Sequence, residues 1–201
     1  MGSKAVGVVG RPKVAAEKAE WRRRFRDRRA QAGPAALARA SAQIVGRLRA
    51  LPEVEGAGVV HLFWPLPGEV DLRPLAEALR ARGATIALPA VAGGRTLVHR
   101  RYLGAAHLVP GRWGTSEPGP DAPAIRPDEI DVVVVPGLAF GRDGGRLGAG
   151  GGYYDTFLAG TGAARLGVCP GWALVDAVPT EPHDARMDAV VTEAAVVRAA
   201  R

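Results

Sequence analysis

Cysteine is almost absent from this chain. The single residue, Cys169, has no partner for an internal disulfide bond, which fits a reducing compartment such as the cytoplasm. We interpret it as a small apolar residue at a strand end. No apolar run approaches the roughly 20 residues of a membrane-spanning helix, so no membrane association is expected. Residues 1–14 lack a continuous apolar stretch and a clear cleavage site, and we expect a flexible leader there rather than a signal peptide.

Aromatic residues are also scarce, at 5% of the chain. The basic segment 11–49 has twelve lysines and arginines against three acids, but only Trp21 and Phe25 as aromatic residues. Proteins that bind single-stranded nucleic acids interleave basic residues with aromatic residues that stack on bases. The net charge of +7 is consistent with an anionic partner. The basic segment could form a phosphate or nucleic-acid surface, but for most of its arginines a solvated helix face is the favoured interpretation, and RNA binding is kept as a weaker alternative.

The chain of 201 residues suits one domain, which we place at residues 15–201. Apolar periodicity predicts helices over residues 15–32, 34–51 and 72–82. Short apolar runs predict strands over residues 57–63, 84–89, 96–102, 131–135, 165–169 and 189–192. Residues 104–128, rich in Pro and Gly, are expected to form an ordered loop. Because strands alternate with helices, we expect a layered α/β fold, with a mostly parallel sheet flanked by helices in a Rossmann-like three-layer arrangement.

A glycine-rich segment, Arg146 to Asp155, follows the valine run 132–135, which is typical of a central strand covered on both faces. Ligands of open α/β sheets bind beyond the carboxyl ends of such strands. Backbone N–H groups of the glycines, a helix that begins at Tyr153, and Arg146 together predict a phosphate cradle. No Gly-Lys-Ser/Thr follows, which excludes a P-loop, and the distance from the strand is too long for a dinucleotide fingerprint. A flexible loop remains the alternative interpretation.

The cradle belongs to a longer motif. Residues 136–155 read PGLAFGRDGGRLGAGGGYYD, and this segment is similar to the pattern P-x-x-A-F-D-x-x-G-x-R-L-G-Y-G-G-G-Y-Y-D-R of the 5-formyltetrahydrofolate cyclo-ligase (methenyltetrahydrofolate synthetase) family. Segments 18–22, 67–71, 114–118 and 178–193 resemble other parts of that family in the same order. Three positions depart from the pattern: Gly141 replaces Asp, Ala149 replaces an aromatic residue and Ala173 replaces Gln. We expect these departures to affect substrate preference or rate.

The resemblance implies a cyclo-ligase-type fold and an enzyme of folate and one-carbon metabolism. Such a ligase uses ATP and Mg²⁺ to convert 5-formyltetrahydrofolate into 5,10-methenyltetrahydrofolate, with release of ADP and phosphate. Its expected partners are therefore the reduced folate and ATP, with no nucleic acid. A relative of the same fold that binds a nucleotide or folate without cyclising it stays open as an alternative.

The resemblance also implies roles for individual residues. The expected ATP-binding residues are Lys18, Arg22, Arg146, Leu147, Gly148, Ala149, Gly150, Gly151, Gly152, Tyr153 and Tyr154. Arg146 and Tyr154 are expected to be catalytic. Trp64 and Glu69 are expected to bind the folate. Asp155 and Asp184 are expected to hold Mg²⁺, a cation that prefers carboxylate and phosphate oxygens.

Several of these residues have a simpler interpretation from the sequence alone. Lys18 and Arg22, four positions apart, could lie on a solvated helix face, and Asp184 could cap a turn. Trp64 could pack under its loop, and Glu69 could be an exposed loop acid. The four histidines (His61, His99, His107 and His183) lack metal-ligand spacing, and we expect no chemistry from them.

Overall fold

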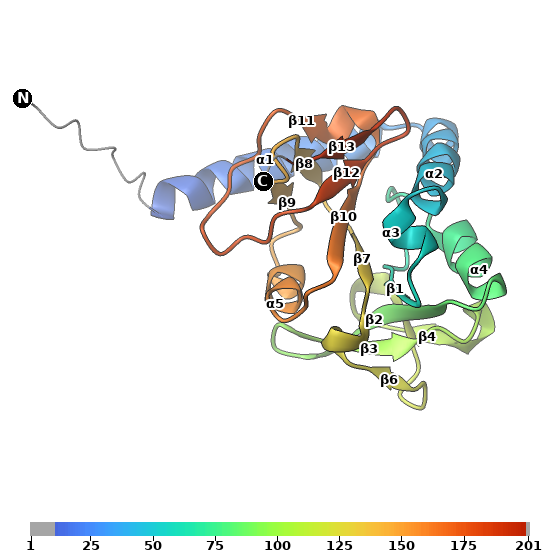
Figure 1. The fold of residues 1–201 in the computed structure, drawn as a ribbon. Helices are drawn as coiled ribbons and strands as arrows, with labels where there is room; N and C mark the ends of the chain where they lie inside the picture. Colours follow the sequence, from blue (N-terminus) through green and yellow to red (C-terminus); the bar gives the residue numbers. More distant parts are fainter. Residues whose placement is uncertain (1–10, 200–201) are drawn as a thin grey trace, which may run out of the picture.

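A computed structural model describes residues 11–199 of the chain. Its main feature is an eight-stranded sheet with the strand order β13-β12-β10-β7-β1-β2-β3-β6 (Figure 1). The strands are β1 (Val59–His61), β2 (Thr85–Gly93), β3 (Thr96–Arg101), β6 (Ala124–Ile125), β7 (Val132–Val135), β10 (Ala164–Val168), β12 (Ala189–Val191) and β13 (Val196–Arg198). The five central strands, from β12 to β2, are parallel, whereas β13, β3 and β6 join the edges antiparallel.

Five α-helices cover the two faces of this sheet. They are α1 (Arg11–Gln31), α2 (Pro34–Arg49), α3 (Pro52–Glu55), α4 (Arg73–Ala81) and α5 (Tyr153–Ala159). The valines of β7 show the layers directly, because alternate side chains point to opposite faces. Val132 and Val134 pack in the core formed with α2, α3 and α4, whereas Val133 and Val135 pack in the core formed with α1 and α5. The prediction of a three-layer α/β fold is confirmed.

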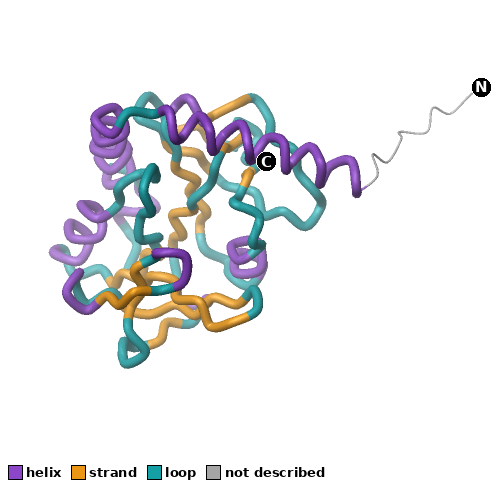
Figure 2. Tube along the Cα trace, turned by 180° about the vertical axis from the view of Figure 1, so that it is seen from behind, coloured by secondary structure: helices purple, strands orange, loops and turns teal. Residues whose placement is uncertain are grey.

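Helix α1 crosses the carboxyl ends of the central strands, as the view from behind shows (Figure 2). It begins at Arg11, four residues before the expected start. Of the expected leader, residues 11–14 therefore lie in α1, and residues 1–10 lie outside the described residues. Among the helices within residues 11–199, none has the length and apolar character needed to cross a bilayer.

The region 104–128 contains more regular structure than the expected loop. It holds β4 (Leu108–Pro110), β5 (Ser116–Pro118) and the edge strand β6, together with the short 3₁₀ helices η1 (Ala105–His107), η2 (Arg112–Gly114) and η3 (Pro127–Glu129). Strands β4 and β5 pair with each other. Such two- and three-residue strands have no sequence periodicity to detect, since only pairing with a partner defines them.

A small three-stranded sheet also escaped the sequence prediction. It consists of β8 (Ala139–Gly141), β9 (Arg146–Leu147) and β11 (Leu174–Val175), and η4 (Gly171–Ala173) precedes the last of these. Strand β9 forms the first two residues of the glycine-rich segment. This sheet therefore fixes the entry to the cradle.

Two buried histidines pack edge to face under α5. His61 on β1 and His99 on β3 have ring centroids 5.0 Å apart, and both rings contact Phe157. Neither ring nitrogen of His61 has a hydrogen-bond partner among the described residues. Burial, and for His61 also the neighbouring His99, lowers the pKa of both rings, that of His99 to about 4.

These lowered pKa values predict acid instability. Stability from a neutral buried histidine is fully present above the unfolded pKa of about 6.5 and is lost as pH falls toward the folded value. We expect the melting temperature to fall by about 4 °C or more between pH 7.5 and pH 5. His99→Phe should weaken this dependence, and the matched change His107→Phe at an exposed position should not. Thermal melts across this pH range test it, and equal slopes for all three proteins would contradict it.

Candidate active site

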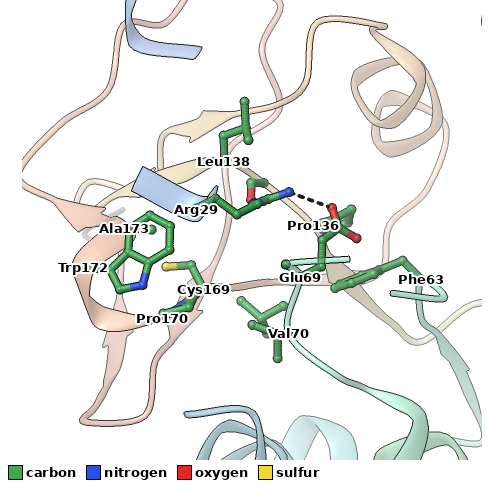
Figure 3. Close-up of a pocket in the computed structure, with 13 residues that line it drawn as sticks. Arg29, Phe63, Glu69, Val70, Pro136, Leu138, Cys169, Pro170, Trp172 and Ala173 are labelled. Carbon is green, nitrogen blue, oxygen red and sulfur yellow. Dashed lines mark hydrogen bonds and ion pairs between the residues drawn. The ribbon is translucent and has the colours of Figure 1, made fainter. Parts of the chain in front are cut away.

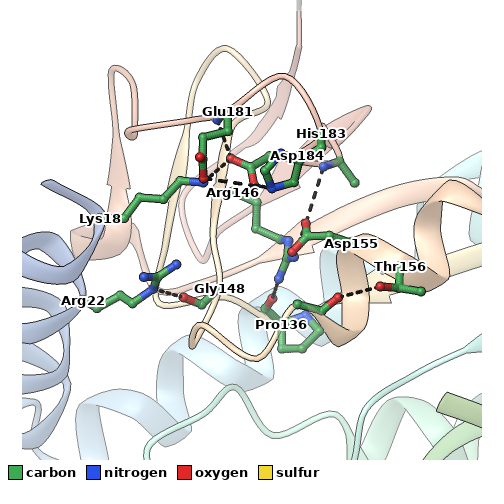
Figure 4. Close-up of polar contacts among 12 residues, drawn as sticks. Lys18, Arg22, Pro136, Arg146, Gly148, Asp155, Thr156, Glu181, His183 and Asp184 are labelled. Carbon is green, nitrogen blue, oxygen red and sulfur yellow. Dashed lines mark hydrogen bonds and ion pairs between the residues drawn. The ribbon is translucent and has the colours of Figure 1, made fainter. Parts of the chain in front are cut away.

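Arg146 organises the glycine-rich segment. Its side chain is only 5% exposed, and it forms an ion pair with Asp155 on α5 at 2.7 Å (Figure 4). The guanidinium also donates to the carbonyl of Pro136, at the end of β7, over 3.3 Å. Between the two partners the chain turns through Gly152, whose φ of +74° favours glycine. The Arg146–Asp155 pair thus closes the loop from β9 to α5.

Three basic side chains of α1 hold the same loop and its neighbour. Lys18 donates to Glu181 at 2.7 Å and to Asp184 at 2.6 Å (Figure 4). Arg22 donates to the carbonyl of Gly148 at 3.0 Å, and Arg26 donates to that of Ala149 at 2.9 Å. The solvated-face interpretation is wrong for Lys18, whose side chain is 7% exposed.

These contacts enclose a polar pocket of about 250 Å³. It gathers every residue expected to bind ATP or metal, although these residues come from three distant parts of the chain. The pocket is lined by Lys18, Arg22, Arg95, Arg146, Leu147, Gly148, Ala149, Gly150, Gly151, Gly152, Tyr153, Tyr154, Asp155, Glu181, His183 and Asp184. Sequence reasoning missed Arg95, Glu181 and His183. Because α5 has only seven residues, the positive charge here comes mainly from side chains rather than from a helix dipole.

A second pocket of about 250 Å³, with mostly apolar walls, adjoins the first. It contains both residues expected to bind folate, Trp64 and Glu69. The lining residues missed from the sequence include Arg29, Phe63, Leu97, Trp113 and Glu117. The two pockets share Arg146, Ala149, Tyr153 and Tyr154. They meet beyond the carboxyl ends of β1 and β7, where the strand order reverses direction, the usual ligand position in such sheets.

Glu69 is held by the protein rather than exposed. Arg29 of α1 contacts one carboxylate oxygen at 3.3 Å, and the backbone N–H of Leu66 donates to the other at 3.2 Å (Figure 3). Cys169 and Trp172 line a small cavity on the other side of Arg29. Cys169 is buried, and this burial raises its thiol pKa to about 12, which agrees with its interpretation as an apolar residue.

Three potential metal ligands cluster at the far end of the polar pocket. One ligand atom each from Glu181, His183 and Asp184 lies within 4.8 Å of the others. Hydrogen bonding from Lys18 lowers the pKa of Glu181. Burial alone raises the pKa of Asp184, but Lys18 and the backbone N–H of Glu181 more than offset it, so that pKa also lies below its usual value. Both carboxylates are therefore ionised at neutral pH.

The chain matches the model of the 5-formyltetrahydrofolate cyclo-ligase family over residues 14–193. It belongs to this family. The chain is 32% identical over 180 residues to the 5-formyltetrahydrofolate cyclo-ligase of Escherichia coli K12, and the alignment covers 86% of this chain and 98% of that protein. It is 35% identical over 140 residues to the Mycolicibacterium smegmatis 5-formyltetrahydrofolate cyclo-ligase, and the alignment covers 66% of this chain and 72% of that protein.

Two solved structures share the fold of this chain. The NMR structure of Aquifex aeolicus 5,10-methenyltetrahydrofolate synthetase has a TM-score of 0.82 to this chain at 32% identity, and the match covers 90% of this chain and 92% of that one. The 5,10-methenyltetrahydrofolate synthetase of Mycoplasma pneumoniae shares the fold, with a TM-score of 0.72 at 18% identity. Its match covers 88% of this chain and 99% of that one.

The departure from the cyclo-ligase pattern at Gly141 has a local explanation. A Cβ at this position would lie 2.2 Å from a carboxylate oxygen of Asp143. That carboxylate accepts the backbone N–H of Gly145 at 3.0 Å and pairs with Arg186 at 3.0 Å. Asp143 thus occupies the space that an Asp at position 141 would need, and an acidic group is kept beside the loop.

Lys18 is expected to contribute to stability as well as to the site, because it neutralises two carboxylates. Lys18→Met should lower the melting temperature above about pH 5, where both acids are ionised, because it leaves the carboxylates of Glu181 and Asp184 beside each other without their cation. Stability from acids with lowered pKa values is lost as pH falls, so the difference from the unchanged protein should shrink near pH 4. Melts of Lys18→Met beside Lys13→Met, an exposed lysine of the same helix, test this. Equal melting temperatures for the two variants would contradict it.

Proposed function

We propose that this chain converts 5-formyltetrahydrofolate into 5,10-methenyltetrahydrofolate, with ATP as co-substrate and with release of ADP and phosphate. The observation that carries the proposal is the junction of the two pockets at Arg146 and Tyr154. One pocket is basic and glycine-lined, as a triphosphate requires. The other is mostly apolar, with the anchored carboxylates of Glu69 and Glu117 in its wall, as a pterin ring requires.

The proposed reaction takes place where the pockets meet. The formyl oxygen of the folate attacks the γ-phosphorus of ATP, and ADP leaves. N10 of the folate then attacks the activated carbon and closes the new ring. The former formyl oxygen leaves as phosphate, which takes up the proton that N10 loses. Chemistry of this kind depends on alignment and on neutralisation of negative charge rather than on a strong protein base.

Arg146 and Tyr154 are the proposed catalytic residues. The Nε of Arg146 and the hydroxyl of Tyr154 are buried without a hydrogen-bond partner among the described residues, so both donors are free for a ligand. Burial raises the pKa of Tyr154, with Glu69 adding to the effect, and the phenol therefore keeps its proton. The neutral hydroxyl of Tyr154 and the guanidinium of Arg146, side by side where the pockets meet, suit a substrate oxygen that gains negative charge during the reaction.

The carboxylates of the polar pocket fit Mg²⁺, which we propose as the cofactor. Asp155 and Asp184 both line this pocket, and carboxylate oxygens are the ligands that this hard cation prefers. Glu181 is a further oxygen donor beside Asp184. Bound there, Mg²⁺ would neutralise phosphate charge. Arg146 pairs with Asp155, and Lys18 pairs with Asp184.

The alternative of RNA binding loses support from α1. Arg22, Arg26 and Arg29 donate to carbonyl groups of the chain itself and are thus committed to the site. For the location of the enzyme we propose the cytoplasm. The single buried thiol of Cys169 suits a reducing compartment.

The overall reaction can be tested directly. Purified protein mixed with 5-formyltetrahydrofolate, ATP and Mg²⁺ should generate the absorbance of the methenyl product, and omission of either ATP or the metal should abolish it. A folded sample that binds nucleotide but gives no product would favour the non-cyclising relative instead.

Asp155 provides a test of the metal proposal. Asp155→Asn keeps the shape but removes the charge, both beside the triphosphate and opposite Arg146. We expect turnover to fall at least about tenfold, or about 1.4 kcal/mol in the barrier, and added Mg²⁺ to restore part of it. Thr156→Val, at the next position of α5, which is exposed, serves as control. The measurement is turnover as a function of Mg²⁺ concentration. If its Mg²⁺ dependence is the same as in the unchanged protein, Asp155 is not a metal ligand.

A further inference from the structure

One face of α1 carries four basic side chains that contact different parts of the active site. Lys18, Arg22, Arg26 and Arg29 follow one another at intervals of four, four and three residues, which places them on the same side of the helix. The first three contact the polar pocket, as described above. Arg29 lies at the other end of the row and contacts the folate pocket. A single helix thus runs along both pockets.

Arg29 is fixed by two loops at once. One guanidinium nitrogen donates to the carbonyl of Gly137, two residues after β7, at 2.8 Å. The other nitrogen forms the ion pair with Glu69 at 3.3 Å. The loop before Glu69 also packs on the arginine stem, because a Cβ on Gly68 would lie 3.0 Å from the Cγ of Arg29. The side chain is 22% exposed, so most of it is enclosed.

This arrangement gives Arg29 a role that its sequence context does not indicate. We propose that Arg29 is a positioning residue: it orients the Glu69 carboxylate toward the folate in a mostly apolar pocket. Without this partner the carboxylate would turn toward water, because burying a charge without a partner is unfavourable. A planar guanidinium can bridge the Gly137 carbonyl and the carboxylate at fixed angles, whereas a lysine offers a single point of charge.

The inference rests on the proposed function, because Glu69 is the proposed folate anchor. It predicts that loss of Arg29 affects the two substrates unequally. The Michaelis constant for folate should rise, since the carboxylate that accepts hydrogen bonds from the pterin is no longer held in place. The Michaelis constant for ATP should stay nearly constant, because Arg29 does not line the polar pocket.

The test compares three variants in the absorbance assay. Arg29→Met should raise the Michaelis constant for folate at least about tenfold. Its constant for ATP should stay within about twofold. Arg23→Met, an exposed arginine on the outer face of α1, should match the unchanged protein. If Arg29→Met fails to fold, Arg29→Lys replaces it, with an expected rise for folate of about threefold.

A double-mutant cycle separates action through Glu69 from a direct contact with the substrate. In a Glu69→Gln background, Arg29→Met should change folate affinity by about twofold or less, because the charge that it orients is already gone. If Glu69→Gln binds folate too weakly to measure, Glu69→Asp takes its place in the cycle. Arg29→Met should then lower folate affinity less in the Glu69→Asp background than in the protein that keeps Glu69.

Two kinds of result overturn the inference. The first is an additive cycle, in which Arg29→Met costs the same with and without Glu69. The second is an unchanged Michaelis constant of Arg29→Met for folate, or Michaelis constants for folate and ATP that rise equally. Failure of the proposed function is recognised separately, because the unchanged protein would then form no product at all.

Discussion

A buried guanidinium needs acceptors, and Arg146 has two of them at the point where both pockets meet. It pairs with Asp155 and donates to the carbonyl of Pro136, and these contacts connect β9, β7 and α5. The glycine-rich loop closes around that connection, and both pockets meet there. Without the ion pair the low-dielectric surroundings would disfavour the charge, and the loop would lose the group that closes it.

Helix α1 shows how a strongly basic segment can serve structure and binding together. Its net charge suggests a partner outside the protein, yet four of its cations contact carbonyls and carboxylates of the chain itself. Phe25, on the same helix, is buried against the sheet, and its ring lies 5.7 Å from that of Trp21. Hydrophobic contact thus docks the helix, and the basic face extends along both pockets. The same helix therefore contributes to the walls of both pockets.

Much of the fold followed from local patterns. The valines of β7 predicted a strand covered on both faces, and the Gly33-Pro34 boundary separated α1 from α2, as the structure has them. The strands of two or three residues did not follow, because backbone pairing with distant segments defines β8, β9 and β11. The conformation of region 104–128 depends on tertiary pairing for the same reason.

The sequence by itself determined the glycine-rich cradle, because Arg146, the glycines and Asp155 are neighbours along the chain and their backbone requirements are local. It also determined the alternation of strands and helices, because the pattern of apolar residues within each segment indicates its secondary structure. Only the tertiary structure decided which charges meet. Lys18 is paired with Asp184 across 166 positions, and Arg29 with Glu69 across 40. Such pairs depend on how helices dock over a sheet, and the spacing of residues along the sequence does not predict that docking.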